Sequence, residues 1–210
     1  YIDKVVIKGG ITSLDHDALP SAKVVDMSEW EMTHIDSNKF YFHADKIILP
    51  EILEYIYANA FNYYVREFSI SDDNSYYTAV DGVLYSKNME KLIKYPESKS
   101  GEHYDIPSGV TAIGAYSLTN LQNLKTVYIP ETVTKIEASS ISKNVVIQCK
   151  LNSAAYNYAE INNIAYEIVC DHSFTDYSVV VPATCTEDGA VVYTCSVCGH
   201  TKTEAIAKTA

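Results

Sequence analysis

Two segments of the chain share one pattern: Ile106-Pro107-Ser108-Gly109-Val110-Thr111-Ala112-Ile113-Gly114-Ala115 and Ile129-Pro130-Glu131-Thr132-Val133-Thr134-Lys135-Ile136-Glu137-Ala138. Apolar residues coincide at offsets 0, 4, 7, 9 and 12, the last being Leu118 and Ile141. The same pattern fits copies that begin at Ile7 and Leu49, and a looser copy begins at Met27, so anchors recur every 20 to 23 residues. A unit of this length cannot bury its apolar side alone, and neighbouring units must stack. The repeat therefore predicts a solenoid.

Each unit is expected to contain a short strand that ends at the anchor, a turn opened by Pro or Gly, and a compact segment that returns inward. The predicted interior column consists of Ile7, Met27, Leu49, Ile70, Ile106 and Ile129. Strand side chains alternate between faces, so the residue before each anchor should point outward from a parallel sheet on the concave face. We call these the ladder residues: Val6, Asp26, Ile48, Ser69, Lys94, Asp105 and Tyr128, with Lys94 preceding Tyr95. The N-terminal copies also include Leu14, Leu19 and Phe40, with His16 at a small-residue position.

Two features interrupt or close the repeat. Residues 80–85 and 92–96 have the pattern of a hairpin joined by polar residues, which predicts an inserted hairpin in an irregular repeat. Asn152-Ser153-Ala154-Ala155 offers a helix N-cap followed by helix formers up to Ile161, and residues 166–169 resume a strand. We expect this helical segment to cap an α/β solenoid that spans residues 1–170.

The repeats at residues 106–118 and 129–141, the stretch Asp81-Gly82-Val83-Leu84-Tyr85-Ser86 and the Asn152-Ser153-Ala154-Ala155 cap resemble the BspA-like leucine-rich repeat family of bacterial surface proteins. The resemblance covers roughly residues 2–169 and is specific from Asp81 onward. It implies a leucine-rich-repeat fold with the sheet on its concave face. It also implies a secreted or wall-attached protein that adheres to extracellular host or bacterial surface proteins.

The net charge limits the classes of partner that the chain is expected to bind. The chain has 16 Lys and Arg against 27 Asp and Glu, a net charge of −11, so capture of nucleic acid or anionic lipid is not expected. Its apolar runs are far shorter than the ~20 residues of a membrane helix, and no membrane insertion is expected. Tyr1 opens directly on a strand-like stretch, so we expect that any export signal has been removed.

Residues 171–210 lack the repeat and are predicted to form a small, mostly β module with a cluster of cysteines. Cys195-x-x-Cys198 offers two thiolates at zinc-ligand spacing, and Cys185 with His172 would complete a Cys₃His site, with His200 as a competing fourth ligand. A disulfide and reduced thiols remain open alternatives. Cys149 and Cys170 are predicted to be small core residues.

This tail resembles a short module that recurs, often in tandem, in surface proteins of anaerobic bacteria. The resemblance rests on residues 182–189 and 193–200, and it implies that the chain is cut from a longer protein.

The sequence predicts a protein without catalytic activity. It contains no Gly-x-Ser-x-Gly, phosphate-binding glycine loop or His-Glu-x-x-His, and it places His16, His34, His43 and His103 in separate repeats. Two functions remain: a binding module that uses the ladder residues, and a structural spacer that presents another domain. An exposed apolar or aromatic cluster on the sheet would favour binding, and a uniformly charged face would favour the spacer.

Overall fold

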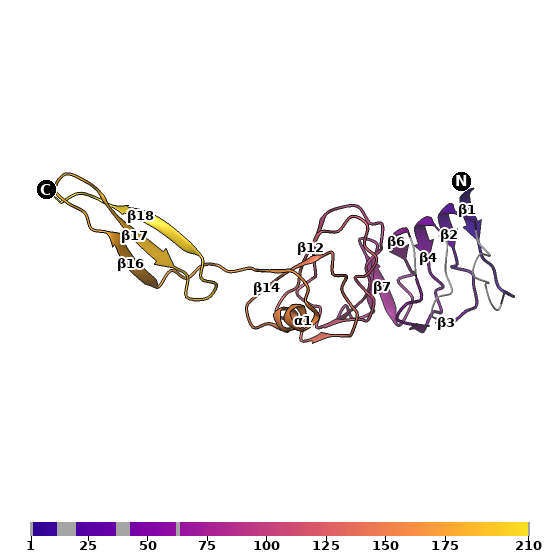
Figure 1. The fold of residues 1–210 in the computed structure, drawn as a ribbon. Helices are drawn as coiled ribbons and strands as arrows, with labels where there is room; N and C mark the ends of the chain where they lie inside the picture. Colours follow the sequence, from indigo (N-terminus) through magenta and orange to yellow (C-terminus); the bar gives the residue numbers. More distant parts are fainter. Residues whose placement is uncertain (1, 12–19, 37–42, 62–63, 210) are drawn as a thin grey trace. The chain divides into compact units, whose positions relative to one another are not determined.

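The computed structural model describes residues 2–11, 20–36, 43–61 and 64–209, which form two compact units, Tyr1–Glu167 and Ile168–Ala210 (Figure 1). The predicted boundary, between residues 170 and 171, lies three residues later. The difference matters because it assigns Cys170 to the second unit. Of the residues named above, Leu14, His16, Leu19 and Phe40 lie outside the described part of the chain.

One side of the first unit carries the longer strands. The first parallel sheet contains β1 (Ile2–Val6), β2 (Ala22–Asp26), β4 (Ala44–Ile48) and β6 (Val65–Ser69). A second sheet contains β10 (His103–Asp105), β12 (Thr126–Tyr128), β14 (Val146–Cys149) and β15 (Tyr166–Ile168). The strand register places Val6, Asp26, Ile48 and Ser69 side by side, and likewise Asp105 and Tyr128. The predicted ladder therefore exists as two separate runs.

The return side carries shorter strands. These are β3 (His34–Ile35), β5 (Tyr55–Ile56), β11 (Ala112–Ile113) and β13 (Lys135–Ile136), and they pair in parallel within β3–β5 and β11–β13. Turns or short helical segments were predicted here. In the repeat that starts at residue 106, hydrogen-bonded turns at residues 107–110 and 114–117 leave too few residues between them for a turn of helix.

The inserted hairpin is confirmed, but residues 80–85, predicted to form one of its two arms, contain the turn between two strands. It contains β7 (Tyr77–Val80), β8 (Val83–Ser86) and β9 (Lys91–Lys94), paired antiparallel in that order. β9 then pairs in parallel with β11 of the short-strand side. This strand, which carries Lys94, therefore belongs to the side opposite the predicted ladder.

The interior column is confirmed. Ile7, Met27, Leu49, Ile106 and Ile129 are buried and Ile70 is partly buried. One detail differs, because the residues at offset 9 are partly or fully exposed whereas the small residues at offset 11, Ser117 and Ser140, are buried. The residue before each serine adopts a left-handed conformation, and that turn brings the following residue inward.

The cap helix α1 spans Ala154–Asn162 and begins where the sequence predicts it. The Ser153 side chain accepts a hydrogen bond of 3.1 Å from the Tyr156 N–H, and Ala155 and Ala159 are buried.

In the second unit, β16 (Asp176–Val181), β17 (Gly189–Thr194) and β18 (Thr201–Ile206) form an antiparallel sheet (Figure 1). Among the described residues, no helix has the length and apolar character needed to cross a membrane.

Candidate functional site

The ladder residues of the first sheet differ in how far they are accessible. Val6 is exposed, Ile48 and Ser69 are partly exposed, and Asp26 is buried. The Asp26 carboxylate pairs with Lys4 Nζ at 2.7 Å and accepts hydrogen bonds from the Ser28 N–H and hydroxyl. Burial alone would raise the pKa of Asp26, but the contacts with Lys4 and Ser28 hold the pKa below its ordinary value. Asp26 thus stabilises the sheet instead of presenting a free carboxylate.

Ion pairs between adjacent strands run across this first sheet. Besides the Lys4 pair, they are Lys23–Asp3 at 2.5 Å, Lys46–Glu67 at 2.9 Å and Arg66–Asp45 at 3.2 Å. A face whose charges are already paired offers little binding energy to a partner, since exposed ion pairs are weak and well solvated. This pattern is the one expected of a spacer.

Lys94 is not a ladder residue, contrary to the prediction. Its strand β9 lies on the short-strand side, and its side chain is buried against Glu97. The second run of the ladder, by contrast, is accessible: Asp105 is exposed and Tyr128 is partly exposed. The His103 ring contacts a residue of each strand in this run. Its Nδ1 lies 2.6 Å from Thr126 Oγ1, and its Nε2 lies 2.9 Å from Asp105 Oδ1.

An exposed aromatic group lies on the short-strand side of the first unit, where the sequence predicted no site. We call His34, Tyr55 and Tyr57 the tyrosine surface. The rings of Tyr55 and Tyr57 meet edge to face with centroids 4.9 Å apart, and His34 lies 6.1 Å from Tyr55. The two tyrosines are 49% and 44% exposed. In the sequence they flank the interior residue Ile56, and this alternation is the signal that marks them as outward.

Tyr77 holds the strand beneath the tyrosine surface in place. Its hydroxyl accepts a hydrogen bond from the Ile56 N–H at 3.1 Å and donates one to the Glu54 carbonyl at 3.3 Å. Burial raises the pKa of Tyr77. The side chain therefore satisfies backbone groups at the open edge of β5.

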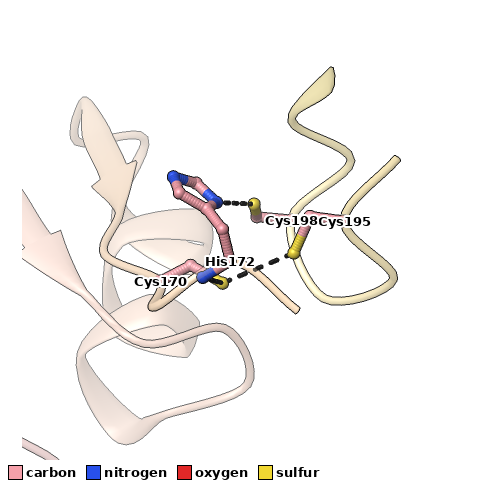
Figure 2. Close-up of side chains that lie close together, drawn as sticks. All are labelled: Cys170, His172, Cys195 and Cys198. Atoms are coloured by element: carbon pink, nitrogen blue, oxygen red, sulfur yellow. Dashed lines mark hydrogen bonds between the residues drawn. The ribbon is translucent and has the colours of Figure 1, made fainter. Parts of the chain in front are cut away.

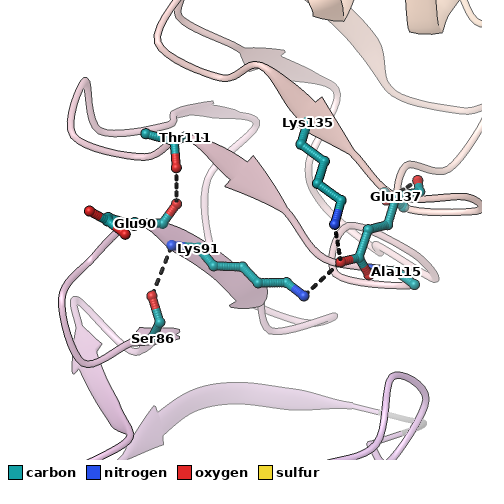
Figure 3. A network of polar contacts seen from close by, with 8 residues as sticks. Ser86, Glu90, Lys91, Thr111, Ala115, Lys135 and Glu137 are labelled. Atoms are coloured by element: carbon teal, nitrogen blue, oxygen red, sulfur yellow. Dashed lines mark hydrogen bonds and ion pairs between the residues drawn. The ribbon is translucent and has the colours of Figure 1, made fainter.

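A pocket of about 170 Å³ adjoins the tyrosine surface, and its lining includes Tyr55, Tyr57, Lys91 and Glu137. Glu137 is anchored by Lys91 Nζ at 2.7 Å, by Lys135 Nζ at 3.9 Å and by the Ala115 N–H at 3.0 Å (Figure 3). The bond from Lys91 is the main reason that the pKa of Glu137 is lowered. The pocket therefore has a polar lining in which the Glu137 carboxylate is paired with lysines.

The second unit gathers a different group, the Cys/His cluster: Cys170, His172, Cys195 and Cys198 (Figure 2). Their ligand atoms all lie within 4.8 Å of one another. The Cys170 and Cys195 sulfurs are 3.6 Å apart, and Cys198 Sγ lies 3.3 Å from His172 Nδ1. The structure therefore brings together three of the four predicted metal ligands and adds Cys170.

Two short segments position these four side chains. Cys170 and His172 lie between β15 and β16, and Cys195 and Cys198 lie in the turn between β17 and β18. That turn is closed by hydrogen bonds from the Cys195 N–H to the His200 carbonyl at 2.8 Å and from the Gly199 N–H to the Cys195 carbonyl at 2.9 Å. Gly199 has a φ of 74°, a conformation that favours glycine.

The cluster favours the ionised form of one thiol. Burial opposes ionisation of Cys195, but the N–H groups of Cys198 and Val197, together with His172, lower its pKa to about 6. For Cys198, the His200 N–H lowers the pKa, whereas burial and the neighbouring sulfurs of Cys195 and Cys170 raise it, with a net increase. The low pKa of Cys195 is the environment expected of a thiolate ligand.

Two cysteine assignments change. Cys185 is exposed and is not a member of the cluster, because it lies in the connection between β16 and β17. Cys170 was predicted to be a core residue, and that prediction is wrong, whereas Cys149 is buried as predicted. The signal for Cys170 in the sequence is its spacing, since Cys170-x-His172 places two ligands on one short segment. His200 stacks on His172 with centroids 4.6 Å apart.

The remaining described histidines contact partners near their own repeats. His34 adjoins Tyr55, His43 stacks on Tyr64 with centroids 4.1 Å apart, and His103 pairs with Asp105. They are not drawn together into a shared site.

The first unit is a parallel β-solenoid of the leucine-rich-repeat class. Residues 94–172 match the family described as BspA type Leucine rich repeat region (6 copies). The chain therefore contains a BspA-type leucine-rich repeat region, which confirms the resemblance found in the sequence.

Solved structures resemble the chain in fold. A leucine-rich repeat protein of Eubacterium ventriosum is 21% identical with a TM-score of 0.50, over 63% of this chain and 43% of that protein. A leucine rich cell surface protein of Faecalibacterium prausnitzii is 22% identical with a TM-score of 0.49, over 69% of this chain and 40% of that one. The chain thus spans about two fifths of the length of these proteins. No curated protein matches the sequence significantly.

Proposed function

We propose that this chain is a non-enzymatic binding segment of a secreted or wall-attached bacterial protein, and that its partner is an extracellular host or bacterial surface protein. The BspA-type repeat region supports a place at the cell surface. The net charge of −11 disfavours nucleic acid and anionic membranes as partners.

The observation that carries the proposal is the tyrosine surface. Tyrosine is enriched at protein interfaces because its ring contributes a large apolar area at low entropic cost and its hydroxyl forms hydrogen bonds. Tyr55 and Tyr57 present two such rings side by side next to a pocket of about 170 Å³. We therefore place the principal contact on the short-strand side, around β5, and not on the ladder residues.

A second candidate function is favoured by the ion pairs of the first long-strand sheet. Their cross-strand pairing gives a charged face whose charges are paired with one another, which fits a spacer. The spacer function assigns no partner to the tyrosine surface.

The test starts with capture of partners from host extracellular matrix and mucosal proteins by the full chain. We expect the double variant Tyr55→Ala, Tyr57→Ala to bind the captured protein about 30-fold more weakly, the effect of losing ~2 kcal/mol at an interface hot spot. The matched control is Tyr128→Ala with Ile48→Asp on the ladder, for which we expect a change below about threefold. Circular dichroism confirms that both variants are folded.

The reverse result, with binding lost only in the ladder variant, would move the site to the long-strand side. Failure to capture any protein from these sources would favour the spacer.

A further inference from the structure

We propose that Cys170, His172, Cys195 and Cys198 form a closed, structural Zn²⁺ site that holds residues 168–210 in their fold. This site is independent of the proposed binding function, because none of its ligands belongs to the tyrosine surface or to the ladder.

The distances fit the size of a zinc tetrahedron. With Zn–S bonds of about 2.3 Å and Zn–N bonds of about 2.0–2.1 Å, tetrahedral geometry separates two sulfurs by about 3.8 Å and a sulfur from a nitrogen by about 3.6 Å. The corresponding separations are 3.6 Å between Cys170 and Cys195 and 3.3 Å between Cys198 and His172. Four protein ligands complete the shell, which is the hallmark of a structural site and leaves no position for substrate.

The chemistry of the ligands selects the metal. Three sulfurs and one imidazole nitrogen are soft or borderline ligands, which suit Zn²⁺ and not the oxygen-seeking Ca²⁺ or Mg²⁺. Figure 2 shows the four side chains converging from two segments. The segments are tied by a hydrogen bond from the Ser196 N–H to the Ser173 carbonyl at 3.2 Å, so the halves of the site are held together by the backbone as well.

A backbone N–H group also contacts one of the sulfurs. The His172 N–H donates to Cys170 Sγ at 3.3 Å, and His172 Nδ1 lies 3.3 Å from Cys198 Sγ. Such donors delocalise the negative charge of thiolate ligands and orient them on the metal. The backbone of the Cys170–His172 segment therefore helps to orient Cys170.

The second unit has a small apolar core, so a bound metal ion would add stability that its packing does not provide. Its strand β16 is exposed along its whole length, and β18 is exposed except for Ile206. The buried apolar side chains described in this unit are Val191 and Cys195. Domains below about 70–80 residues with so little core usually depend on disulfides or a structural metal.

A disulfide between Cys170 and Cys195 is the main competitor, because their sulfurs are in contact. Its formation would remove two electrons and two protons to an external oxidant. It would use only two of the four clustered residues and would leave the approach of His172 to Cys198 unexplained.

The test compares single-cysteine variants of the full chain, prepared under reduction and without nickel affinity steps. We expect one zinc per chain by elemental analysis in the original protein and in Cys185→Ser, and zinc loss in Cys170→Ser and Cys198→Ser. Cys185→Ser is the matched control because it removes a cysteine of the same unit outside the cluster. Replacing zinc with Co²⁺ should produce the intense visible bands of a tetrahedral site and thiolate charge-transfer absorption.

A further variant, His172→Cys, keeps the test independent of folding defects. It retains four ligands, so it should keep one zinc per chain, and its Co²⁺ form should show stronger thiolate charge-transfer absorption. Zinc retained in Cys170→Ser but lost in Cys185→Ser would overturn the ligand set. The proposal would also fail if the reduced chain held no zinc and bound no Co²⁺, or if peptide mapping showed a Cys170–Cys195 disulfide in protein prepared without reductant.

Discussion

Lys94 and Glu97 form an ion pair in the interior of the first unit, with 2.6 Å between Lys94 Nζ and Glu97 Oε1. Their side chains are only 5% and 1% exposed. Lys94 also donates to the Tyr116 carbonyl at 3.2 Å. Burial raises the pKa of Glu97, and Lys94 opposes that increase. Each charge in this pair is tolerated because the other is present.

Removing one partner should therefore cost far more than removing both. We expect Lys94→Met to lower the free energy of unfolding by about 3–5 kcal/mol, because Glu97 is left buried without a counter-ion. The double variant Lys94→Met, Glu97→Leu should recover most of that loss. Urea denaturation measures both. The control is Lys125→Met, which breaks the exposed pair with Glu102 and should cost at most about 1 kcal/mol. Equal losses for Lys94→Met and Lys125→Met would contradict the prediction.

Single residues were predicted from the sequence where the repeat was regular. Five of the six anchor residues are buried as expected and Ile70 is partly buried, because stacked repeats place equivalent residues in one column. Lys94 was misplaced because alternation was extended through the inserted hairpin, where the chain leaves the long-strand side. Cys170 was missed for the same kind of reason: proximity between residues 25 positions apart depends on the tertiary fold.

At the scale of elements, the turn between β7 and β8 depends on Gly82. Asp81 and Gly82 have φ values of 48° and 75°, as in a two-residue hairpin turn with both central residues left-handed. The Gly82 carbonyl accepts a hydrogen bond from the Phe68 N–H, so the turn lies directly against β6. A Cβ at Gly82 would lie 2.6 Å from Glu67 Cβ and 3.1 Å from its Cα.

We therefore expect Gly82→Ala to lower the free energy of unfolding by about 2–3 kcal/mol, from the strained conformation and the displacement of β6. Gly109→Ala is the control. Its Cβ would meet nothing within 4 Å, and Gly109 is not in the left-handed region, so stability should be unchanged or raised by up to about 1 kcal/mol. Chemical denaturation followed by circular dichroism measures both, and similar stabilities for the two variants would refute the argument.

Elements were predictable where they carry a local signal. The cap helix was predicted from Ser153 and the helix formers after it. Asp81-Gly82 also carries a local turn signal, but these residues were predicted to lie inside an arm of the hairpin. The two-residue strands β3, β5, β11 and β13 have no such signal, since two residues are too few to show a period. These strands form only because the repeats stack. The tyrosine surface, which includes Tyr55 of β5, was therefore not predicted from the sequence.

At the scale of the molecule, the two units are stabilised in different ways. The solenoid is held by apolar side chains that are buried on successive long strands, among them Val25, Ile47, Phe68, Val127 and Ile147. The second unit has almost no such core, and its best-connected feature is the Cys/His cluster. Metal removal should therefore act on the two units unequally.

The single tryptophan of the chain makes this difference measurable. Trp30 is 2% exposed in the core of the first unit, and its indole N–H donates to the Ile11 carbonyl at 2.6 Å. Its fluorescence therefore reports unfolding of the solenoid alone.

We expect a zinc chelator to leave the denaturation midpoint reported by Trp30 fluorescence unchanged. In the same sample, the amide hydrogens of β17 and β18 should lose their protection from exchange, because zinc binding is coupled to folding. Added Zn²⁺, but not Mg²⁺, should restore that protection. A lower Trp30 midpoint after chelation would show that zinc also stabilises the solenoid, and protection that persists in metal-free protein would show that the second unit folds without zinc.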